Sequence, residues 1–569
     1  MQKIKTSLIL TTLTMSHCRP VRKEKLSRRA ILTLFFYIGS IGLILGQTKE
    51  PTWDNTSKRY WSPEFKKVEI PSSKDRAMQK AYIYKTTRKK PQPLIVSLHT
   101  WSGYYNQTDP LAKEILARDW NYIHPDFRGA NRTFSAMCSP LALADIEDAI
   151  QYALQHTNTD PEDVHIVGVS GGGLATLAAY MYLSYPVKSF SAWAPISDIE
   201  AWYWESVGRG QKYANDILQA ISTDGKTFDS KEAISRSPLR QVFPIERRKN
   251  AQLFIYEGIH DGYKGSVPIT HSLNMYNRLV GELKYNTSDM DEIMRKACDD
   301  ADLISPKEII DLLSKRTNPE HKNNETLFGR SVHLKRQYKN INLTIFEGRH
   351  EQLPQALGLI PYKRQTDLKY DILAIGDSNG ANKDGWVAQL TEMMPKSDIV
   401  NLSESGRTIG FDNNGRPRLN ALKNIDSYLD KAMAQKHRYD YIIVCLGTND
   451  FKKMFGARQG EISENLKSLL TKIKNHDLYK KGHTKLIYVT PPPLRKDDIS
   501  PKYEGSGERL ARMIPELKAV ASELGCDVLD IHKLLSGILD YYAKDGVHMP
   551  GSGQDIVASQ IVNHILSHQ

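Results

Sequence analysis

Cysteine is scarce in this sequence, which has five cysteines among 569 residues. No two of them stand in the Cys-x-x-Cys spacing that is typical of zinc-binding motifs and redox-active pairs. The spacing therefore assigns neither a zinc site nor a disulfide framework.

Basic clusters with interleaved aromatic residues are also missing beyond residue 46. The net charge of the chain is +12, but residues 1–46 alone hold eight Lys/Arg against one Glu. A basic patch that includes aromatic side chains is the expected footprint of a nucleic-acid-binding surface. We therefore expect no nucleic acid as a partner.

Long hydrophobic runs are absent apart from one, residues 30–46, which follows a basic stretch that ends in Arg28 and Arg29. A basic flank, an apolar core and a small residue at its end are typical of a signal peptide, and the run is short for a membrane span. We predict that residues 1–46 are a signal peptide and that the mature protein begins near Gln47. It would be exported, periplasmic or secreted, without stable membrane insertion, in a bacterial cell. An uncleaved anchor is the alternative.

A Gly-x-Ser-x-Gly match at Gly168, Ser170 and Gly172 stands out among the motifs that are present. A β-type run precedes it and a helix-forming run, 174–179, follows it. A serine at the tip of a sharp strand-to-helix turn exposes its Oγ, and glycines permit the strained backbone. Ser170 is therefore a candidate nucleophile, with a glycine-rich turn without chemistry as the alternative.

Two later strand ends supply a candidate acid and base in the order expected for such a serine. Asp261 follows the predicted strand 253–256, and His350 follows the predicted strand 341–346. His260 and His271 are rivals for the base, but they lie on or near the loop of the acid. We therefore expect His350 to be the base.

A second, unrelated pattern begins after residue 370. Ser378 follows a predicted strand, 370–375, and Asn449 follows another, 441–446. Asp545 and His548 stand three residues apart on one loop, so His548 can lie beside Ser378 with Asp545 behind it. Asn449 can donate its side-chain amide to a developing oxyanion.

Apolar runs of strand length alternate with helix-forming stretches in both regions, which predicts mostly parallel sheets and the α/β fold class. A polar stretch at 364–368 separates the two regions. We expect a first domain over 47–363 and a second over 366–569. A charged helical insert at about 289–315 would either cap the first site or decorate the surface.

The first region resembles the α/β-hydrolase superfamily in its prolyl-oligopeptidase-like branch. The matching pieces are the segments 168–173, 260–268 and 348–350. The resemblance implies an oxyanion hole made by the backbone N–H groups of Gly171 and of either Thr100 or Trp101. Peptidases of this branch carry a β-propeller before the hydrolase domain. Only a short stretch precedes the first strand here, so a size-gated oligopeptidase is not expected.

The second region resembles the SGNH (GDSL-type) hydrolases, because all four blocks of that family occur in order. They are Gly376-Asp377-Ser378, Gly406, Gly447-x-Asn449-Asp450 and Asp545-x-x-His548. The resemblance implies a flavodoxin-like fold, with Ser378 as nucleophile, His548 as base and Asp545 as orienting acid. It also implies an oxyanion hole from Ser378, Gly406 and Asn449.

Two predicted serine-esterase active sites on one exported chain suggest one polymeric substrate that bears more than one kind of ester. We predict a bifunctional carbohydrate esterase that removes acetyl groups, and methyl or aromatic acyl groups as further candidates, from a plant-type polysaccharide or oligosaccharide. Neither mechanism uses a metal or a cofactor, and none is expected. The alternatives are an exported lipase or peptidase-like acyl hydrolase, and a polysaccharide-binding protein with one inactive domain. Five tryptophans could stack on sugar rings or belong to the core: Trp53, Trp61, Trp101, Trp202 and Trp204.

Overall fold

Ten strands around the first motif form one sheet in the order β1-β2-β4-β3-β5-β6-β7-β10-β9-β8. The computed structural model describes residues 61–317 and 325–568. The six strands from β4 to β10 run parallel, and antiparallel strands extend the sheet at both edges. The strands are β1 (Lys66–Pro71), β2 (Met78–Tyr84), β3 (Gln92–Leu98), β4 (Asn121–Pro125), β5 (Thr159–Val169), β6 (Ser189–Trp193), β7 (Gln252–Gly258), β8 (Thr326–Leu327), β9 (Arg330–Tyr338) and β10 (Ile341–Phe346).

The helices of this first domain cover both faces of the sheet. Strands β3, β4 and β6 are buried along their whole length, as parallel strands between two helical layers must be. Ser139 caps α3 by accepting a hydrogen bond from the N–H of Ala142, and Pro140 fills the first helical position. The helices are α2 (Leu111–Arg118), α3 (Pro140–His156), α4 (Gly171–Tyr182), α5 (Ile199–Gly208), α6 (Tyr213–Ile221), α7 (Ser230–Ser235), α8 (Ile245–Arg248), α9 (Thr270–Tyr285), α10 (Met290–Lys296) and α11 (Pro306–Lys315).

The predicted insert at 289–315 forms α10 and α11, which are anchored on α9. Ile293 lies against Gly281 of α9, and the side chain of Asn277 on α9 bonds both the N–H and the C=O of Ile304. A different helical segment, α5 to α7, lies next to the loop that follows β3. There Trp101 Nε1 donates to Asp216 of α6 at 3.0 Å.

Five parallel strands form the second sheet, in the order β12-β11-β13-β14-β15. In chain order this is 2-1-3-4-5, the flavodoxin-like order, so the α/β fold class predicted for both regions is confirmed. The strands are β11 (Asp371–Gly376), β12 (Asp398–Asn401), β13 (Tyr441–Cys445), β14 (Lys485–Val489) and β15 (Asp527–Leu529).

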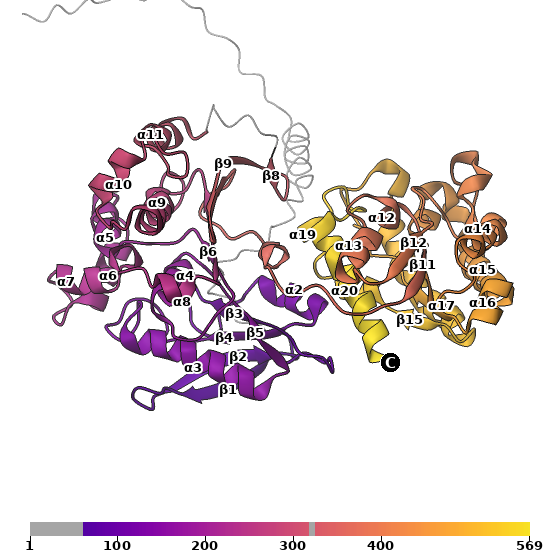
Figure 1. The fold of residues 1–569 in the computed structure, drawn as a ribbon, viewed down its shortest axis with the longest axis horizontal. Coiled ribbons are helices and arrows are strands. Elements are labelled where there is room, and N and C mark those ends of the chain that lie inside the picture. The colour runs from indigo at the N-terminus through magenta and orange to yellow at the C-terminus, as the bar shows by residue number, and fades with distance from the viewer. Residues whose placement is uncertain (1–60, 318–324, 569) are drawn as a thin grey trace, which may run out of the picture. The chain divides into compact units, whose positions relative to one another are not determined.

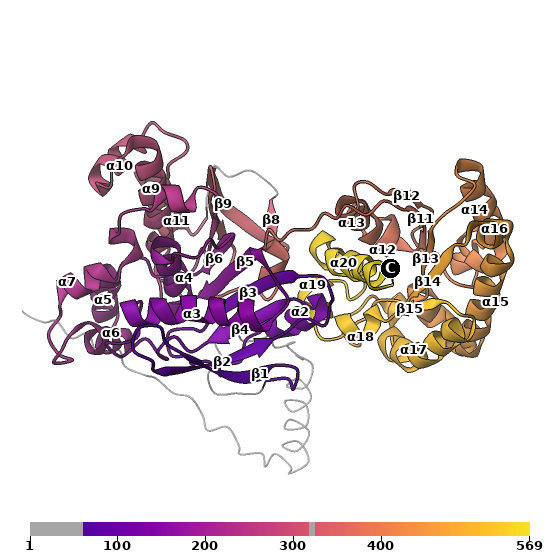
Figure 2. The ribbon, with the colours of Figure 1, turned by 60° about the horizontal axis from the view of Figure 1, so that its bottom comes forward.

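Helices cover this second sheet on both faces. In Figure 1, α13 and α20 lie on one side of β11 and β12, and α14 and α15 lie on the other. Figure 2 again shows α20 and α15 on opposite sides of the strands. The helices are α12 (Ser378–Ala381), α13 (Trp386–Met393), α14 (Ala421–Gln435), α15 (Ile462–Asn475), α16 (Asp477–Gly482), α17 (Ser506–Glu523), α18 (Ile531–Leu535), α19 (Leu539–Tyr542) and α20 (Gly551–Ser567).

The described residues, 61–317 and 325–568, form one compact unit that includes both sheets. Arg118 of α2 is fully buried, and its guanidinium bonds Glu114 at 2.6 Å and Asp555 of α20 at 2.8 Å. The hydroxyl of Tyr542 donates to the same Glu114 at 2.6 Å. A buried charge is tolerated only when it is paired in this way, so this network fastens α2 to α19 and α20. The predicted boundaries at 363 and 366 stay a prediction.

The predicted signal peptide, residues 1–46, lies outside the described residues, as does Trp53. Within residues 61–317 and 325–568, none of the helices combines the length and the apolar character needed to cross a bilayer. All four cysteines in these residues are free thiols: Cys138, Cys298, Cys445 and Cys526.

Candidate active sites

Ser170 occupies a strained turn between β5 and α4, with φ at +59° and ψ at −119°. The glycines of the motif are required by contact distance. A Cβ on Gly168 would lie 2.3 Å from the carbonyl oxygen of Gly172, and a Cβ on Gly172 would lie 2.3 Å from that of Leu98. Only glycine fits such close backbone approaches. The turn lifts Ser170 to the carboxyl end of the sheet, as the motif predicts.

The structure brings together the three residues that the sequence proposes for the first site. His350 Nε2 lies 2.9 Å from Ser170 Oγ, and His350 Nδ1 lies 2.5 Å from Asp261 Oδ2. The other carboxylate oxygen of Asp261 accepts the N–H groups of Gly262 and Val267. The acid is therefore fixed by backbone donors and in turn fixes the imidazole.

The two rival histidines have other partners. His260 Nε2 lies 2.8 Å from Glu347, and His271 Nε2 lies 3.1 Å from Glu205. The geometry therefore places His350, and neither rival, beside Ser170.

The loop after β3 offers Trp101 rather than Thr100 as an oxyanion donor. The N–H of Thr100 already donates to Gln107 Oε1 at 2.9 Å. The backbone nitrogen of Trp101 lies 2.5 Å from where a Cβ on Gly171 would be, so the backbones of these two residues are adjacent. Asn131, which the sequence did not suggest, places its buried and unbonded Nδ2 2.9 Å from that same position.

Glu257 is a further residue that sequence reasoning missed, because it lies inside an apolar strand. It is fully buried in β7 and accepts a hydrogen bond from Ser272 Oγ at 2.9 Å. Burial and then the charge of Asp261 hold the pKa of Glu257 well above its usual range.

The second site has nearly the same distances on a different scaffold. Ser378 begins α12, directly after β11, and its Oγ lies 2.9 Å from His548 Nε2. His548 Nδ1 lies 2.6 Å from Asp545 Oδ2. Burial alone would raise the pKa of Asp545, but the hydrogen bonds from His548 and from the N–H of Val547 lower it. Asp545 is therefore a carboxylate at neutral pH.

The expected oxyanion residues of the second site are held by side chains that the sequence did not reveal. Asn449 is buried, and its Oδ1 accepts the hydroxyl hydrogen of Tyr503 at 2.8 Å. Its Nδ2 has one hydrogen on the carbonyl of Arg407 at 3.1 Å, which leaves the second hydrogen for a ligand. Gly406 has φ at +85°, and Asn413 donates to its carbonyl at 2.6 Å.

Comparison with known families accounts for both patterns. Residues 114–295 match the model of the prolyl oligopeptidase family, and residues 373–556 match that of the GDSL-like lipase/acylhydrolase family. This chain joins a prolyl oligopeptidase family domain to a GDSL-like acylhydrolase domain. Both resemblances expected from the sequence are thereby confirmed, and the matches support a serine-dependent hydrolase of acyl esters.

Several solved structures are similar to parts of the chain. They include a carbohydrate acetylesterase family member from Sinorhizobium meliloti (19% identity, TM-score 0.29, 35% of this chain and 97% of that chain covered). The native aryl esterase of M. smegmatis is similar at 22% identity and a TM-score of 0.29, with 35% and 98% covered. The acylaminoacyl peptidase of Pyrococcus horikoshii is similar at 18% identity and a TM-score of 0.31, with 38% and 35% covered. The search of curated proteins found no match.

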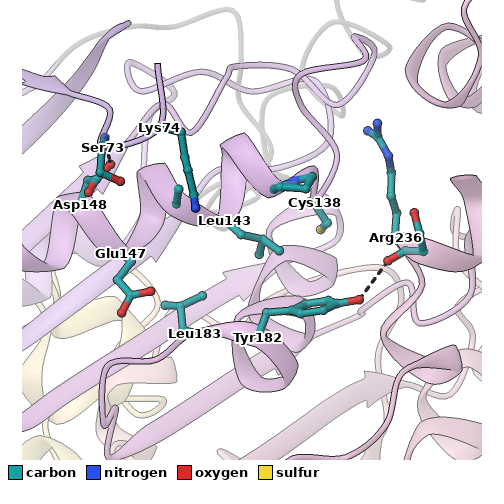
Figure 3. Close-up of a pocket in the computed structure, with 12 residues that line it drawn as sticks. Ser73, Lys74, Cys138, Leu143, Glu147, Asp148, Tyr182, Leu183 and Arg236 are labelled. Carbon is teal, nitrogen blue, oxygen red and sulfur yellow. Dashed lines mark hydrogen bonds between the residues drawn. The ribbon is translucent and has the colours of Figure 1, made fainter. Parts of the chain in front are cut away.

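A cavity of about 600 Å³ in the prolyl oligopeptidase domain contains none of the expected catalytic residues (Figure 3). Its Arg236 donates to the carbonyls of Ala136 and Phe134, and the hydroxyl of Tyr182 donates to the carbonyl of Ser235. Burial raises the pKa of the Cys138 thiol at its edge to about 12, and a protonated thiol is a poor nucleophile. We assign no chemistry to this cavity.

A second cavity, of about 620 Å³, includes Asp545 and His548 of the GDSL domain.

The tryptophans proposed for sugar stacking are mostly core residues: Trp101 and Trp202 are buried, and Trp61 stacks on Tyr82. Trp204 alone among the described ones is largely exposed, at 57%.

Proposed function

We propose that this chain is an exported carbohydrate esterase with two serine active sites. One site comprises Ser170, His350 and Asp261, and the other comprises Ser378, His548 and Asp545. The proposed substrate is a polysaccharide or oligosaccharide that bears acetyl esters and a second kind of ester. The observation that carries the proposal is the presence of two complete Ser–His–Asp constellations, each with a serine-to-histidine distance of 2.9 Å.

The first site would act by covalent catalysis. His350 Nε2 takes the proton of Ser170 as Oγ attacks the ester carbonyl, while Asp261 stabilises the imidazolium through Nδ1. The N–H groups of Gly171 and Trp101 would bind the oxyanion, and the nearby amide of Asn131 can add a third donor. The imidazolium then protonates the leaving alcohol, and water releases the acyl group by the reverse transfers.

The second site would use the same sequence of steps with different donors. His548 takes the proton of Ser378, and Asp545 holds His548 in the required tautomer. The oxyanion would be bound by the N–H groups of Ser378 and Gly406 and by the second amide hydrogen of Asn449. Tyr503 supports this geometry because its hydroxyl fixes the carbonyl end of the Asn449 side chain, which turns the amide nitrogen toward the site.

Two arguments favour a carbohydrate over a lipid. Two ester-cleaving sites on one chain suit a polymer that carries two kinds of ester, since both sites then work on one bound molecule. The predicted signal peptide would export the protein, and a polysaccharide substrate is expected outside the cytoplasm.

Peptide hydrolysis at Ser170 is the second candidate. The observation that favours it is the match of residues 114–295 to the prolyl oligopeptidase family. A panel of aminoacyl and acylaminoacyl p-nitroanilides would show cleavage that Ser170→Ala abolishes if this candidate is correct.

The test of the proposal combines a covalent probe with a substrate panel. A fluorophosphonate should label the wild-type protein at two serines, and Ser170→Ala and Ser378→Ala should each lose one of the two labels. The panel contains acetylated, methyl-esterified and feruloylated polysaccharides, and released acids and methanol are measured. Labelling of one serine only, or release from none of the polymers with both serines labelled, would contradict the proposal.

A further inference from the structure

The hairpin between β8 and β9 has an unusual tip. Thr326 pairs with Ser331 and Leu327 with Arg330, so Phe328 and Gly329 form a two-residue loop. Their φ angles are +49° and +79°. Positive φ at both central residues marks a type I′ turn, for which Asn-Gly is the preferred sequence. A bulky side chain in the first position is strained, and such strain is concentrated at functional sites.

Phe328 lies on the wall of the cavity that contains His548 and Asp545. Its ring faces Tyr542 edge-on, with centroids 6.3 Å apart and an interplanar angle of 80°. Met549 and Pro550 lie on the same cavity. A side chain from the edge of the ten-stranded sheet thus lines the cavity that contains the proposed base of the GDSL domain.

Buried contacts hold this wall in place. Tyr542 bonds Glu114 of α2, and Gln355, which precedes the 3-10 turn Ala356–Leu359, donates to the carbonyl of Tyr541. Leu359 at the end of that turn also lines the cavity. Glu114 and Gln355 therefore hold Tyr541 and Tyr542, which line the cavity, in place.

The chemistry of the cavity suits a flat ring with one apolar face. Phe328, Tyr541, Tyr542 and Met549 provide an apolar surface, while Lys544 and Asp384 provide charged groups for hydroxyls. Its volume of about 620 Å³ falls within the range of roughly 300–1,000 Å³ that is typical of small-molecule pockets, so it has room for more than an acetyl group. His548 must deliver its proton to the leaving alcohol, so the group nearest to His548 is the alcohol part of the ester.

We propose that Phe328 is a specificity-determining residue of the second active site, where it packs against the ring of the ester's alcohol part. Within the proposed function, that ring is a pyranose whose acetyl group Ser378 removes. The inference rests on the proposed function for the identity of the sugar, but the preference for a ring can be measured on simpler esters.

The test uses the full chain with Ser170→Ala, so that only the second site acts. Values of kcat/KM are measured for phenyl acetate, ethyl acetate and an acetylated pyranoside, and each ratio to ethyl acetate is compared between variants. Phe328→Asn should lower both ratios at least tenfold, mainly through KM. Its melting temperature should stay the same or rise, because asparagine relieves the turn.

Lys339→Asn is the matched control. Lys339 is an exposed residue with φ at +50° at the other end of β9, away from the cavity lining. It should leave both ratios unchanged. Phe328→Tyr should keep both ratios within about threefold of the parent, because it keeps the ring.

Three outcomes would overturn the proposal. The ratios could be unchanged in Phe328→Asn, or kcat/KM could fall by the same factor for all three esters in that variant. The third outcome is a decrease of both ratios in Phe328→Tyr as large as that in Phe328→Asn. If Phe328→Asn does not fold, the comparison of Phe328→Leu with Phe328→Tyr decides, because leucine keeps the apolar volume without the ring. Failure of the parent on the pyranoside with normal phenyl acetate cleavage would contradict the proposed function alone.

Discussion

The two proposed active sites have the same serine-to-histidine distance but very different exposure. In the first, the side chains of His350 and Asp261 are 11% and 0% exposed. In the second, those of His548 and Asp545 are 36% and 53% exposed. Closely similar Ser–His–Asp distances therefore coexist with one enclosed and one open site.

The difference in exposure follows from where the acid and the base of each site lie in the chain. Asp261 and His350 follow separate neighbouring strands, β7 and β10, and lie 89 residues apart. The side chain of Asp261 is buried there. Asp545 and His548 share one short loop before α20, on the surface of the second domain. Backbone N–H groups of the same loop orient Asp545. A local loop can thus assemble an acid and a base without burial.

Removing each nucleophile should have the largest effect and tests whether the sites are separate. Ser170→Ala should lower kcat at the first site by about 10⁴-fold or more and spare the second, and Ser378→Ala should do the converse, because the triads share no residue. Active-site titration and release of different acids from the substrate panel would measure this. Loss of both activities in either folded variant would show one shared site.

Removing the first base should have the next largest effect. His350→Ala should cost on the order of 10³-fold or more in kcat at the first site, because triad members act as a unit. His260→Ala and His271→Ala are matched controls, since both histidines bond glutamates away from Ser170. Retained activity in His350→Ala with loss in either control would contradict the triad.

Removing the acid should lower kcat more at the enclosed first site than at the open second site. Asp261→Ala should lower kcat by about 10³-fold or more, because it leaves a buried imidazole N–H without an acceptor. Asp545→Ala should cost about 10²-fold, since water can reach Nδ1 of His548. Equal losses for the two variants would show that exposure of the acid does not matter here.

The residues of both proposed sites could largely be predicted from the sequence. Most of them follow strands, and the carboxyl ends of parallel strands meet at one edge of the sheet. The motif at 168–172, the predicted strands at 253–256 and 341–346 and the order serine, acid, base predict the pairing of Ser170 with His350. The four GDSL blocks predict that of Ser378 with His548. What the sequence could not provide were contacts between distant segments. Phe328 looks like an ordinary turn residue in the sequence, and only the fold shows that it lines the same cavity as His548.

Supporting residues were hidden for the same reason. Tyr503 and Asn413 have no motif of their own, and they matter only because they bond Asn449 and Gly406. The choice between Thr100 and Trp101 depended on Gln107, which takes the N–H of Thr100. The insert at 289–315 was predicted as helical, but its anchoring on α9 depended on tertiary packing.

The smallest expected effect concerns Asp450, a buried carboxyl beneath the open second site. Burial raises its pKa to about 7, although the N–H groups of Ile409 and Gly410 donate to it and partly oppose that shift. An unfolded Asp titrates near about 3.9, so the folded state binds this proton more tightly. The stabilisation is complete below about pH 4 and is lost as pH rises to about 7, with a slope of at most about 1.4 kcal/mol per pH unit.

Asp450→Asn should therefore flatten the decrease in the free energy of unfolding between about pH 4 and pH 7, as measured by urea denaturation at several pH values. Asp530 provides a control of opposite sign. Burial would raise its pKa, but its bond to Lys518 lowers it. Its contribution is present above the unfolded pKa and is lost on acidification, so Asp530→Asn should remove stability near neutral pH and less of it in acid. A wild-type profile that Asp450→Asn leaves unchanged would show that the carboxyl is ionised in the folded protein. The buried loop beneath Gly406 would then hold a charge rather than a proton.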